Sequence, residues 1–374
     1  MSGGISDPGR AFFRPAVDEL TPYQPGKPVE DVQRELGLER VVKLASNEGP
    51  FAPFPAALAA MERVALELNR YPDGGSYRLH EALAARHGVV LEEVCAGAGA
   101  DGCLDMLSQA VLDPGDEVVC GWPSFPSYAI YARKQGAVPK LVPLRAHRYD
   151  LDALIAEVTP RTKLVYVCHP NNPTGTMNTR AELDVFLGRV PEHALVVVDQ
   201  AYFEYVDDPE YPDAVEEYLK RGRRVVVLRT FSKIYGLAGL RVGYAVGPRS
   251  VCAAMAKVRR PFDVTTPAQV AALASLDDAA EIARRRRLNA DGLAQLAAIL
   301  REHGLEPAEG AVGNFLYVDL GEDASTLFER LLGEGVIVRP LHGFGSPTAI
   351  RISVGTPEEN EFFAAALGRV LTRA

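Results

Sequence analysis

The sequence predicts an α/β fold, in which a large domain with a mainly parallel central sheet between helices is joined to a smaller α+β domain. Three observations support this prediction. Between about residues 90 and 250, short β-branched runs alternate with amphipathic helical stretches, as they do around a parallel sheet. Runs such as Leu195–Asp199 (LVVVD) are continuously apolar, as strands buried on both faces are. Residues 291–374 mix short strands and helices in another order, which indicates a second, smaller unit.

Composition limits the classes to which the chain can belong. Its 374 residues are 47% hydrophobic and 24% charged, enough for two or three globular domains. No apolar run approaches the roughly 18 residues of a membrane span, and the formal net charge of −9 argues against a dedicated nucleic-acid binder. The five widely spaced cysteines and the absence of a secretory signal predict a cytoplasmic protein without disulfides. The scattered histidines predict no metal site.

The elements are expected in the following order. Residues 1–45 contain five prolines and are expected to form an extended arm that joins the small domain. Residues 46–255 form the large domain, residues 256–290 an interdomain helical region and residues 291–374 the small domain. In the large domain we expect a helix over 103–112 and strands over 117–120, 163–167, 195–199, 224–228 and 241–246. In the small domain we expect strands over 314–319, 336–338 and 349–354 and helices over 324–332 and 358–371. The basic run 284–287 is expected to be a solvated helix face.

A glycine-rich turn at residues 97–102 (GAGADG) fits the pattern of a dinucleotide-binding loop. That pattern also requires an acidic residue about 20 positions later, at the end of the next strand, to hold a ribose. Here the next strand ends in Cys120-Gly121-Trp122-Pro123, without a carboxylate. The turn therefore predicts a more general anion site, in which free N–H groups at a helix N-terminus face a group such as a phosphate.

Polar residues gather where the predicted strands end. Lys233 lies between hydroxyl residues and an arginine eight positions later, on a loop between two core strands. Asp199 ends an apolar strand, and because an unpaired buried carboxylate is costly it should face a cation or a cofactor. Residues 168–175 form a Pro/Gly-rich loop after another strand. Open α/β sheets bind their ligands at the carboxyl ends of their strands, so these loops predict one shared site.

Several segments carry a family resemblance. FSKIYGLAGLR (231–241), PNNPTG (170–175), DQAYFEY (199–205) and RISVG (351–355) resemble the fold-type I pyridoxal-phosphate aminotransferases. The segments LTPYQ, LASNE, NRYPD and GVIVR, at 20–24, 44–48, 69–73 and 335–339, are similar to those of the histidinol-phosphate aminotransferase branch. The resemblance implies a fold-type I structure, pyridoxal 5′-phosphate as cofactor and a homodimer.

The resemblance assigns roles at the cofactor ring. Lys233 would bond covalently to the cofactor's aldehyde and carry a proton, and a nearby arginine and the cofactor would lower its pKa. Asp199 would pair with the protonated ring nitrogen. Tyr202 and Asn172 match positions that hydrogen-bond the ring's phenolic oxygen. Phe125 matches an aromatic residue that stacks on the ring, where the family often has tyrosine.

The same resemblance supplies a cradle for the cofactor phosphate. Its matching groups are the backbone of Ala100 and Asp101, the hydroxyls of Thr230 and Ser232, and the guanidinium of Arg241.

Further positions match groups that bind substrate or act across a subunit boundary. Tyr71 matches a tyrosine that reaches the phosphate from the neighbouring subunit, which implies shared active sites. Arg351 and Arg339, with Tyr23 from the arm and Asn47, match an anion pocket for the substrate.

The resemblance implies a transamination in histidine biosynthesis. L-Histidinol phosphate and 2-oxoglutarate would be interconverted with imidazole-acetol phosphate and L-glutamate. Two alternatives share most of these segments: an aromatic amino-acid aminotransferase, and a pyridoxal-phosphate-dependent phospho-amino-acid decarboxylase, which needs no keto-acid acceptor.

Overall fold

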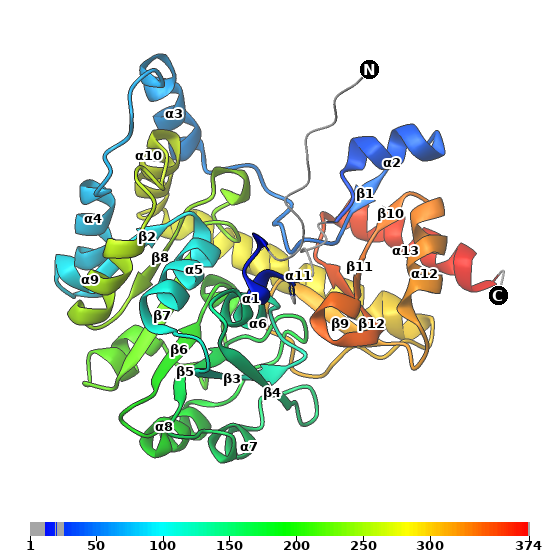
Figure 1. Cartoon of the computed structure of the whole chain (residues 1–374). Coiled ribbons are helices and arrows are strands. Elements are labelled where there is room, and N and C mark those ends of the chain that lie inside the picture. Colours follow the sequence, from blue (N-terminus) through cyan, green and yellow to red (C-terminus); the bar gives the residue numbers. More distant parts are fainter. Residues whose placement is uncertain (1–11, 19, 21–25, 373–374) are drawn as a thin grey trace, which may run out of the picture.

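The computed structural model describes residues 12–18, 20 and 26–372, which form a large and a small unit (Figure 1). The large unit is built on a seven-stranded sheet in the order β2-β8-β7-β6-β5-β3-β4. The strand β8 is antiparallel to both neighbours, and the other pairings are parallel, so the predicted fold class is confirmed. The strands are β2 (Val94–Gly97), β3 (Glu117–Trp122), β4 (Val138–Pro143), β5 (Thr162–Cys168), β6 (Leu195–Asp199), β7 (Val225–Thr230) and β8 (Gly243–Val246).

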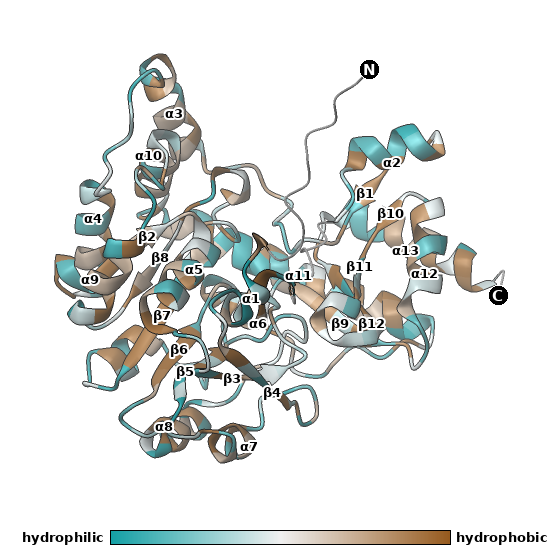
Figure 2. Ribbon diagram, viewed as in Figure 1, coloured by the Kyte–Doolittle hydropathy of each residue, from teal (hydrophilic) through white to brown (hydrophobic). Residues whose placement is uncertain are grey.

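Apolar strands and amphipathic helices account for this unit. Every residue of β6 and β7 is buried, and Figure 2 shows these strands as hydrophobic ribbons beneath helices with mixed faces. The helices are α3 (Pro55–Val64), α4 (Tyr77–His87), α5 (Gly99–Val111), α6 (Ser127–Lys134), α7 (Leu151–Ala156), α8 (Arg180–Arg189), α9 (Arg249–Val258) and α10 (Thr266–Ser275). The last strand begins at Gly243 and not at Arg241, because Arg241 adopts a left-handed backbone conformation with φ 54° that a strand excludes.

The small unit has its own core. Its antiparallel sheet has the order β11-β12-β9, and β10 pairs in parallel with β1 (Val42–Lys43). Buried apolar residues of these strands pack against three helices. Its elements are α11 (Ala279–Glu302), β9 (Phe315–Asp319), α12 (Ala324–Gly333), β10 (Val336–Ile337), β11 (Arg339–Leu341), β12 (Ser346–Ser353) and α13 (Pro357–Thr372). Within the described ranges, no helix combines the length and apolarity needed to cross a bilayer.

The N-terminal region is not extended throughout, which corrects the expectation for residues 1–45. A short helix, α1 (Pro15–Asp18), is followed by the longer α2 (Val29–Leu36). The helix α2 begins directly after Pro28, where the prolines of this region end, and it buries Val32 in a small cluster with residues of the small unit. The pairing of β1 with β10 ties the same region to the small unit, while the domain boundaries stay a prediction.

The basic run 284–287 is not simply a solvated face. Arg284 is half exposed, but the side chain of Arg285 is only 4% exposed. The Arg285 guanidinium donates to the carbonyls of Ile234 and Ala52, at 3.0 and 2.7 Å, and to the carboxylate of Glu281 at 2.7 Å. The expectation was wrong for this residue because a guanidinium with five N–H donors can be buried where several oxygens converge on it.

Candidate active site

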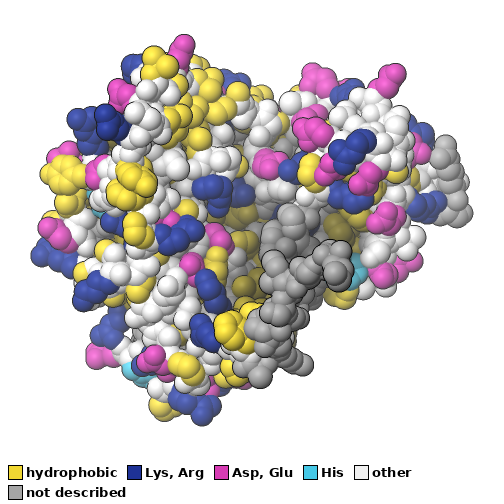
Figure 3. Space-filling view, turned by 45° about the horizontal axis from the view of Figure 1, so that its top comes forward, with side chains coloured by type: hydrophobic (Ala, Val, Ile, Leu, Met, Phe, Trp, Pro, Cys, Tyr) yellow, Lys and Arg dark blue, Asp and Glu magenta, His cyan; other side chains and the backbone are white. Residues whose placement is uncertain are grey.

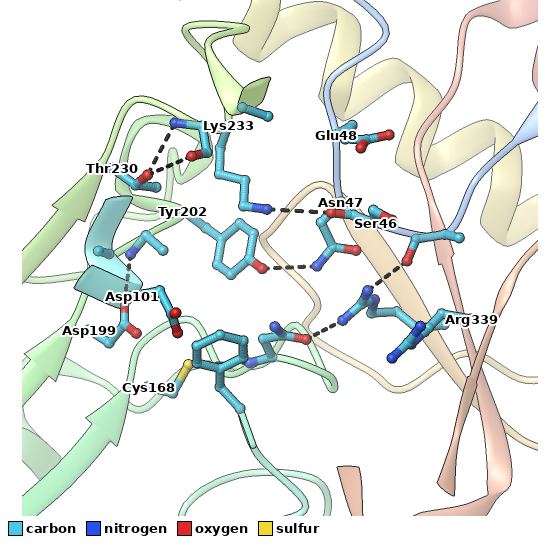
Figure 4. A pocket seen from close by; sticks show the side chains of 18 of the residues that line it. Ser46, Asn47, Glu48, Asp101, Cys168, Asp199, Tyr202, Thr230, Lys233 and Arg339 are labelled. Carbon is cyan, nitrogen blue, oxygen red and sulfur yellow. Dashed lines mark hydrogen bonds between the residues drawn. The ribbon is translucent and has the colours of Figure 1, made fainter. Parts of the chain in front are cut away.

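A cavity of about 370 Å³ lies at the carboxyl ends of the large sheet, beside the small unit (Figure 4). Both units contribute to its walls. Thirteen of the predicted site residues line it: Asn47, Ala100, Asp101, Phe125, Asn172, Asp199, Tyr202, Thr230, Ser232, Lys233, Arg241, Arg339 and Arg351. The topology thus brings together side chains that are more than 300 positions apart in the sequence.

Lys233 points into this cavity from the loop after β7. Its Nζ lies 3.5 Å from the carbonyl oxygen of Ser46 (Figure 4). Burial and then the positive charge of Arg351 lower the pKa of Lys233 to about 8. Arg241, the arginine to which the sequence points, contributes less than Arg351. The site therefore increases the fraction of the neutral amine, the form that can act as a nucleophile or a base.

Asp199 ends β6 at the floor of the cavity, as the apolar run LVVVD predicts. Its Oδ2 accepts a hydrogen bond from the Tyr128 hydroxyl at 2.7 Å, and its Oδ1 accepts one from the backbone N–H of Ala201 at 3.1 Å. Burial raises the pKa of this carboxyl, and both hydrogen bonds oppose that rise. A carboxylate held in this way is suited to a cationic partner in the cavity.

Tyr202 and Asn47 form a link between the two units at the wall of the cavity. The Asn47 amide donates to the Tyr202 hydroxyl at 2.9 Å (Figure 4). The Oδ1 of Asn47 accepts a hydrogen bond from Ser353 on β12 at 3.0 Å. Asn47 has a left-handed backbone with φ 53°, which asparagine tolerates better than most residues. Because both ends of its amide are bonded to the protein, Asn47 connects the small unit to Tyr202.

One end of the cavity is a nest of hydrogen-bond donors. The N-terminus of α5 presents the backbone of Ala100 and Asp101 next to the hydroxyls that follow β7. Thr230 donates to Ser232 at 3.0 Å, and Arg241 donates to the same serine at 3.4 Å. This donor set matches a phosphate in charge and geometry.

Glycine keeps this end open. Gly99, with φ 79°, lets Arg241 approach so closely that a Cβ there would lie 2.6 Å from Nη2. A Cβ on Gly243 would lie 2.4 Å from the backbone nitrogen of Ala100. The residues present therefore fit the phosphate group of a pyridoxal phosphate.

The opposite end of the cavity is cationic. Arg339 and Arg351 are directly paired across β11 and β12, so their side chains share one face of the sheet. Both guanidinium carbons lie over the Phe344 ring, 5.7 and 5.3 Å from its centroid. Arg351 also donates to Asn172 and, at 2.7 Å, to the carbonyl of Ala45. Like charges placed directly opposite one another destabilise a sheet, and a bound anion would offset the repulsion between these two guanidiniums. The pair therefore indicates a binding site for an anion.

Two predicted site residues are not part of this cavity. Tyr71 is 81% exposed and stacks on Phe262, with ring centroids 4.4 Å apart. Tyr23 lies outside the described residues. In the part of the chain that is described, no group of three or more His, Cys, Asp or Glu side chains could hold a metal ion.

Sequence reasoning missed several residues of the site, among them Ser46, Glu48, Phe344 and Tyr128. Ser46, Glu48 and Phe344 line the cavity, and Tyr128 binds Asp199 from behind it. The available signal for Tyr128 was its spacing of three residues from Phe125, which places two aromatic side chains near one another at the start of a helix. Ser46 and Glu48 lie in the segment LASNE (44–48), whose resemblance to the family could have indicated them. Phe344 follows from packing between the units and left no local pattern.

The model of the family described as aminotransferase class I and II matches residues 39–367. A histidinol-phosphate aminotransferase of Moorella thermoacetica is 46% identical over 96% of this chain and 92% of its own length. Histidinol-phosphate aminotransferase 2 of Pseudomonas aeruginosa is 45% identical over 96% of this chain and 98% of its own length.

Solved structures agree with these relatives. Histidinol-phosphate aminotransferase from Sinorhizobium meliloti, determined in complex with pyridoxal-5′-phosphate, superposes with a TM-score of 0.87 at 29% identity, covering 98% of this chain and 99% of that one. Aspartate aminotransferase from Thermus thermophilus with maleate gives 0.82 at 26% identity, covering 97% and 99%. The chain therefore belongs to the aminotransferase class I and II family and groups within it with the histidinol-phosphate aminotransferases.

Proposed function

We propose that this chain is a pyridoxal-phosphate-dependent histidinol-phosphate aminotransferase of histidine biosynthesis. It would interconvert L-histidinol phosphate and 2-oxoglutarate with imidazole-acetol phosphate and L-glutamate. The observation that carries this proposal is the pair Arg339 and Arg351, held side by side by the register of β11 and β12 at the end of the cavity opposite the donor nest. One substrate offers a phosphate and the other two carboxylates, and paired guanidiniums can bind either anion. The names of the relatives support the same substrate.

The cavity residues have complementary tasks in this reaction. When bound, pyridoxal phosphate supplies an electron sink for the negative charge that develops on the substrate carbon bearing the amino group. Lys233, whose pKa is about 8, would accept the proton from that carbon and deliver it to the cofactor's C4′, the transfer that makes the reaction a transamination. Asp199 would hold the cofactor's ring nitrogen as its cationic form. Tyr202 and the Asn172 amide nitrogen would donate to the ring's phenolic oxygen, and Phe125 would cover the ring face.

The donor nest would hold the cofactor phosphate. The backbone of Ala100 and Asp101 offers the positive end of α5, and Thr230, Ser232 and Arg241 add two hydroxyls and a guanidinium. This places one anion site at each end of the cavity. The cofactor would therefore be anchored at one end while the substrate's anionic group is bound at the other.

We further propose a homodimer with shared sites. Large apolar side chains are exposed along and after α3: Leu58 is 46% exposed, Leu66 96% and Leu68 55%. Tyr71 and Phe262 are exposed nearby, and Figure 3 shows hydrophobic side chains gathered at this end of the molecule. A soluble monomer rarely leaves such a patch uncovered. With a second copy on this surface, Tyr71 would reach the donor nest of the partner.

Subunit complementation tests the shared site. The variants Tyr71→Ala and Lys233→Ala are each expected to be nearly inactive as homodimers. Refolding them together is expected to restore activity, because in a hybrid dimer one site contains both an intact Tyr71 and an intact Lys233. Mixtures without activity, in samples that are dimeric by light scattering, would contradict the shared site.

The five cysteines support the predicted cytoplasmic location. All of them are buried and unpaired. A protein that matures in a reducing compartment keeps such thiols free.

A panel of amino donors tests the substrate. With 2-oxoglutarate as acceptor, kcat/KM is expected to be highest for histidinol phosphate. Arg339→Ala is expected to lower kcat/KM for histidinol phosphate by roughly 10- to 100-fold, which corresponds to the loss of one charge-assisted hydrogen bond. The kcat/KM for phenylalanine is expected to fall much less. Arg301→Ala, an exposed arginine of the same unit, is the control. Higher kcat/KM for phenylalanine or tyrosine would favour the aromatic alternative, and release of CO₂ without acceptor would favour the decarboxylase.

A further inference from the structure

We infer that Tyr128 is a positioning residue, which acts through Asp199 by holding its carboxylate ionised and aimed into the cavity. The inference rests on the proposed function, in which Asp199 pairs with the cofactor's ring nitrogen. Tyr128 does not line the cavity itself.

The hydrogen bonds fix both oxygens of the carboxylate. The Tyr128 hydroxyl donates to Oδ2 of Asp199 at 2.7 Å, and the N–H of Ala201 donates to Oδ1 at 3.1 Å. Asp199 is 4% exposed and Tyr128 is fully buried, so water does not compete for the bond between them. Rotation of the carboxylate would break both bonds, which leaves one orientation for its remaining lone pairs.

The ring of Tyr128 is held in place by two other aromatic rings. It stacks on Tyr166 of β5, with centroids 4.5 Å apart and planes 11° from parallel. Its edge meets Phe125, with centroids 5.7 Å apart and planes at 81°. The hydroxyl of Tyr128 therefore cannot swing away from Asp199 without moving Phe125, which faces the cavity. Phe125 directly precedes α6 and Tyr128 lies in its first turn, so the start of this helix supports both the aromatic wall and the acid.

The charges around Asp199 explain why it needs this donor. Burial raises the pKa of the Asp199 carboxyl, and the charge of Asp101 on α5 adds to that rise. The Tyr128 hydrogen bond is the largest influence that lowers it, followed by the backbone N–H bond and the charge of Lys233. The Cys168 thiol of β5 also faces the carboxyl and is kept protonated by burial, which raises its pKa. Removing the Tyr128 hydroxyl would leave Asp199 easier to protonate.

Cofactor affinity as a function of pH provides the test. The apoprotein is titrated with pyridoxal phosphate between pH 5 and 9 and its Kd is measured for the wild type, Tyr128→Phe, Tyr166→Phe and Asp199→Asn. Affinity is expected to fall on the acid side as Asp199 becomes protonated. In Tyr128→Phe this fall is expected about one pH unit higher, roughly the loss of one hydrogen bond to a charged group. In Asp199→Asn, cofactor binding is expected to be weak at every pH and to show no fall on the acid side.

Tyr166→Phe is the matched control. Tyr166 is buried and stacked on Tyr128, and among the described residues it makes no hydrogen bond to Asp199. Its variant is expected to keep the wild-type pH dependence. If Tyr128→Phe behaves like Tyr166→Phe while Asp199→Asn loses affinity, the inference about Tyr128 is wrong and the proposed function stands. If Asp199→Asn binds the cofactor as the wild type does, the proposed role of Asp199 fails first.

The double variant Tyr128→Phe, Asp199→Asn separates positioning from a general loss of structure. If Tyr128 acts only through Asp199, its removal is expected to add no further loss of affinity in the Asp199→Asn background. A full additional loss would show a merely structural role and would overturn the inference. Melting temperatures of the apoproteins identify variants that have not folded. If Tyr128→Phe alone does not fold, the double variant can still be tested, because it contains no buried carboxylate that has lost its hydrogen-bond donor.

Discussion

The amine of Lys233 should titrate far below an ordinary lysine before any cofactor is bound. Its pKa is about 8, against an ordinary value of 10.5. At pH 7 about one amine in ten would then be neutral, roughly 300-fold more than for an ordinary lysine. Burial is the first cause and the charge of Arg351 the second. Removing that charge stabilises the ammonium form, so Arg351→Met is expected to raise the pKa of Lys233.

Glu48 provides a control of opposite sign. Its negative charge raises the pKa of Lys233, so Glu48→Gln is expected to lower that pKa below the wild-type value. Both variants keep the lysine and its loop, and they differ only in which charge is removed from the cavity wall. A general loosening of the site would bring water to the amine and raise its pKa in both variants.

Reductive alkylation of the apoprotein measures this pKa. The protein is treated with a small aldehyde and cyanoborohydride between pH 6 and 11, and the peptide that contains Lys233 is quantified by mass spectrometry. The wild-type midpoint is expected near pH 8, with Arg351→Met above it and Glu48→Gln below it. A wild-type midpoint near 10.5, or shifts of equal sign in the two variants, would refute the electrostatic reasoning.

Three further outcomes follow from buried contacts. Arg285→Met is expected to lower the free energy of unfolding, measured in urea, by about 2–6 kcal/mol, because it leaves the buried carbonyls of Ile234 and Ala52 without their donor, while Glu281 keeps Arg284 as a partner. Arg284→Met should cost less than about 1 kcal/mol, since Arg284 is half exposed. Equal losses in the two variants would contradict this assignment. Gly345→Ala is expected to lower the free energy of unfolding by more than about 2 kcal/mol, because the φ of Gly345 is 85° and a Cβ there would lie 1.7 Å from Trp122. A urea midpoint equal to that of the wild type would contradict this close contact. The five thiols, all buried, are expected to react with a disulfide reagent only after denaturation, and rapid reaction of the native protein would show that one is accessible.

Local sequence was sufficient for the backbone that carries the site. The run LVVVD predicts a strand that ends at Asp199, and the strand does end there. The glycine turn at 97–102 predicts an anion-binding helix start, and α5 begins at Gly99 with a positive φ. These features depend on apolar periodicity and on turn geometry, which neighbouring residues determine.

Some local expectations failed where packing outweighed pattern. The basic run 284–287 resembles a solvated face, yet Arg285 is buried because carbonyls of two distant segments converge on it. The proline-rich region was expected to be an extended arm, yet α2 forms after its last proline and buries Val32. In both cases the deciding partners are far away in the sequence, at residues that give no local signal.

The sequence by itself therefore determined the alternation of strands and helices, the position of Asp199 at the end of its strand and the family to which the motifs point. Only the tertiary structure decided which side chains support those residues. Tyr128 reaches Asp199 across 71 positions, and Arg351 approaches Lys233 from the other unit, because α6 and β12 are packed beside the cavity. A hydrogen bond or a charge acts over a few ångströms of space, and separation along the chain does not specify that distance until the core has packed.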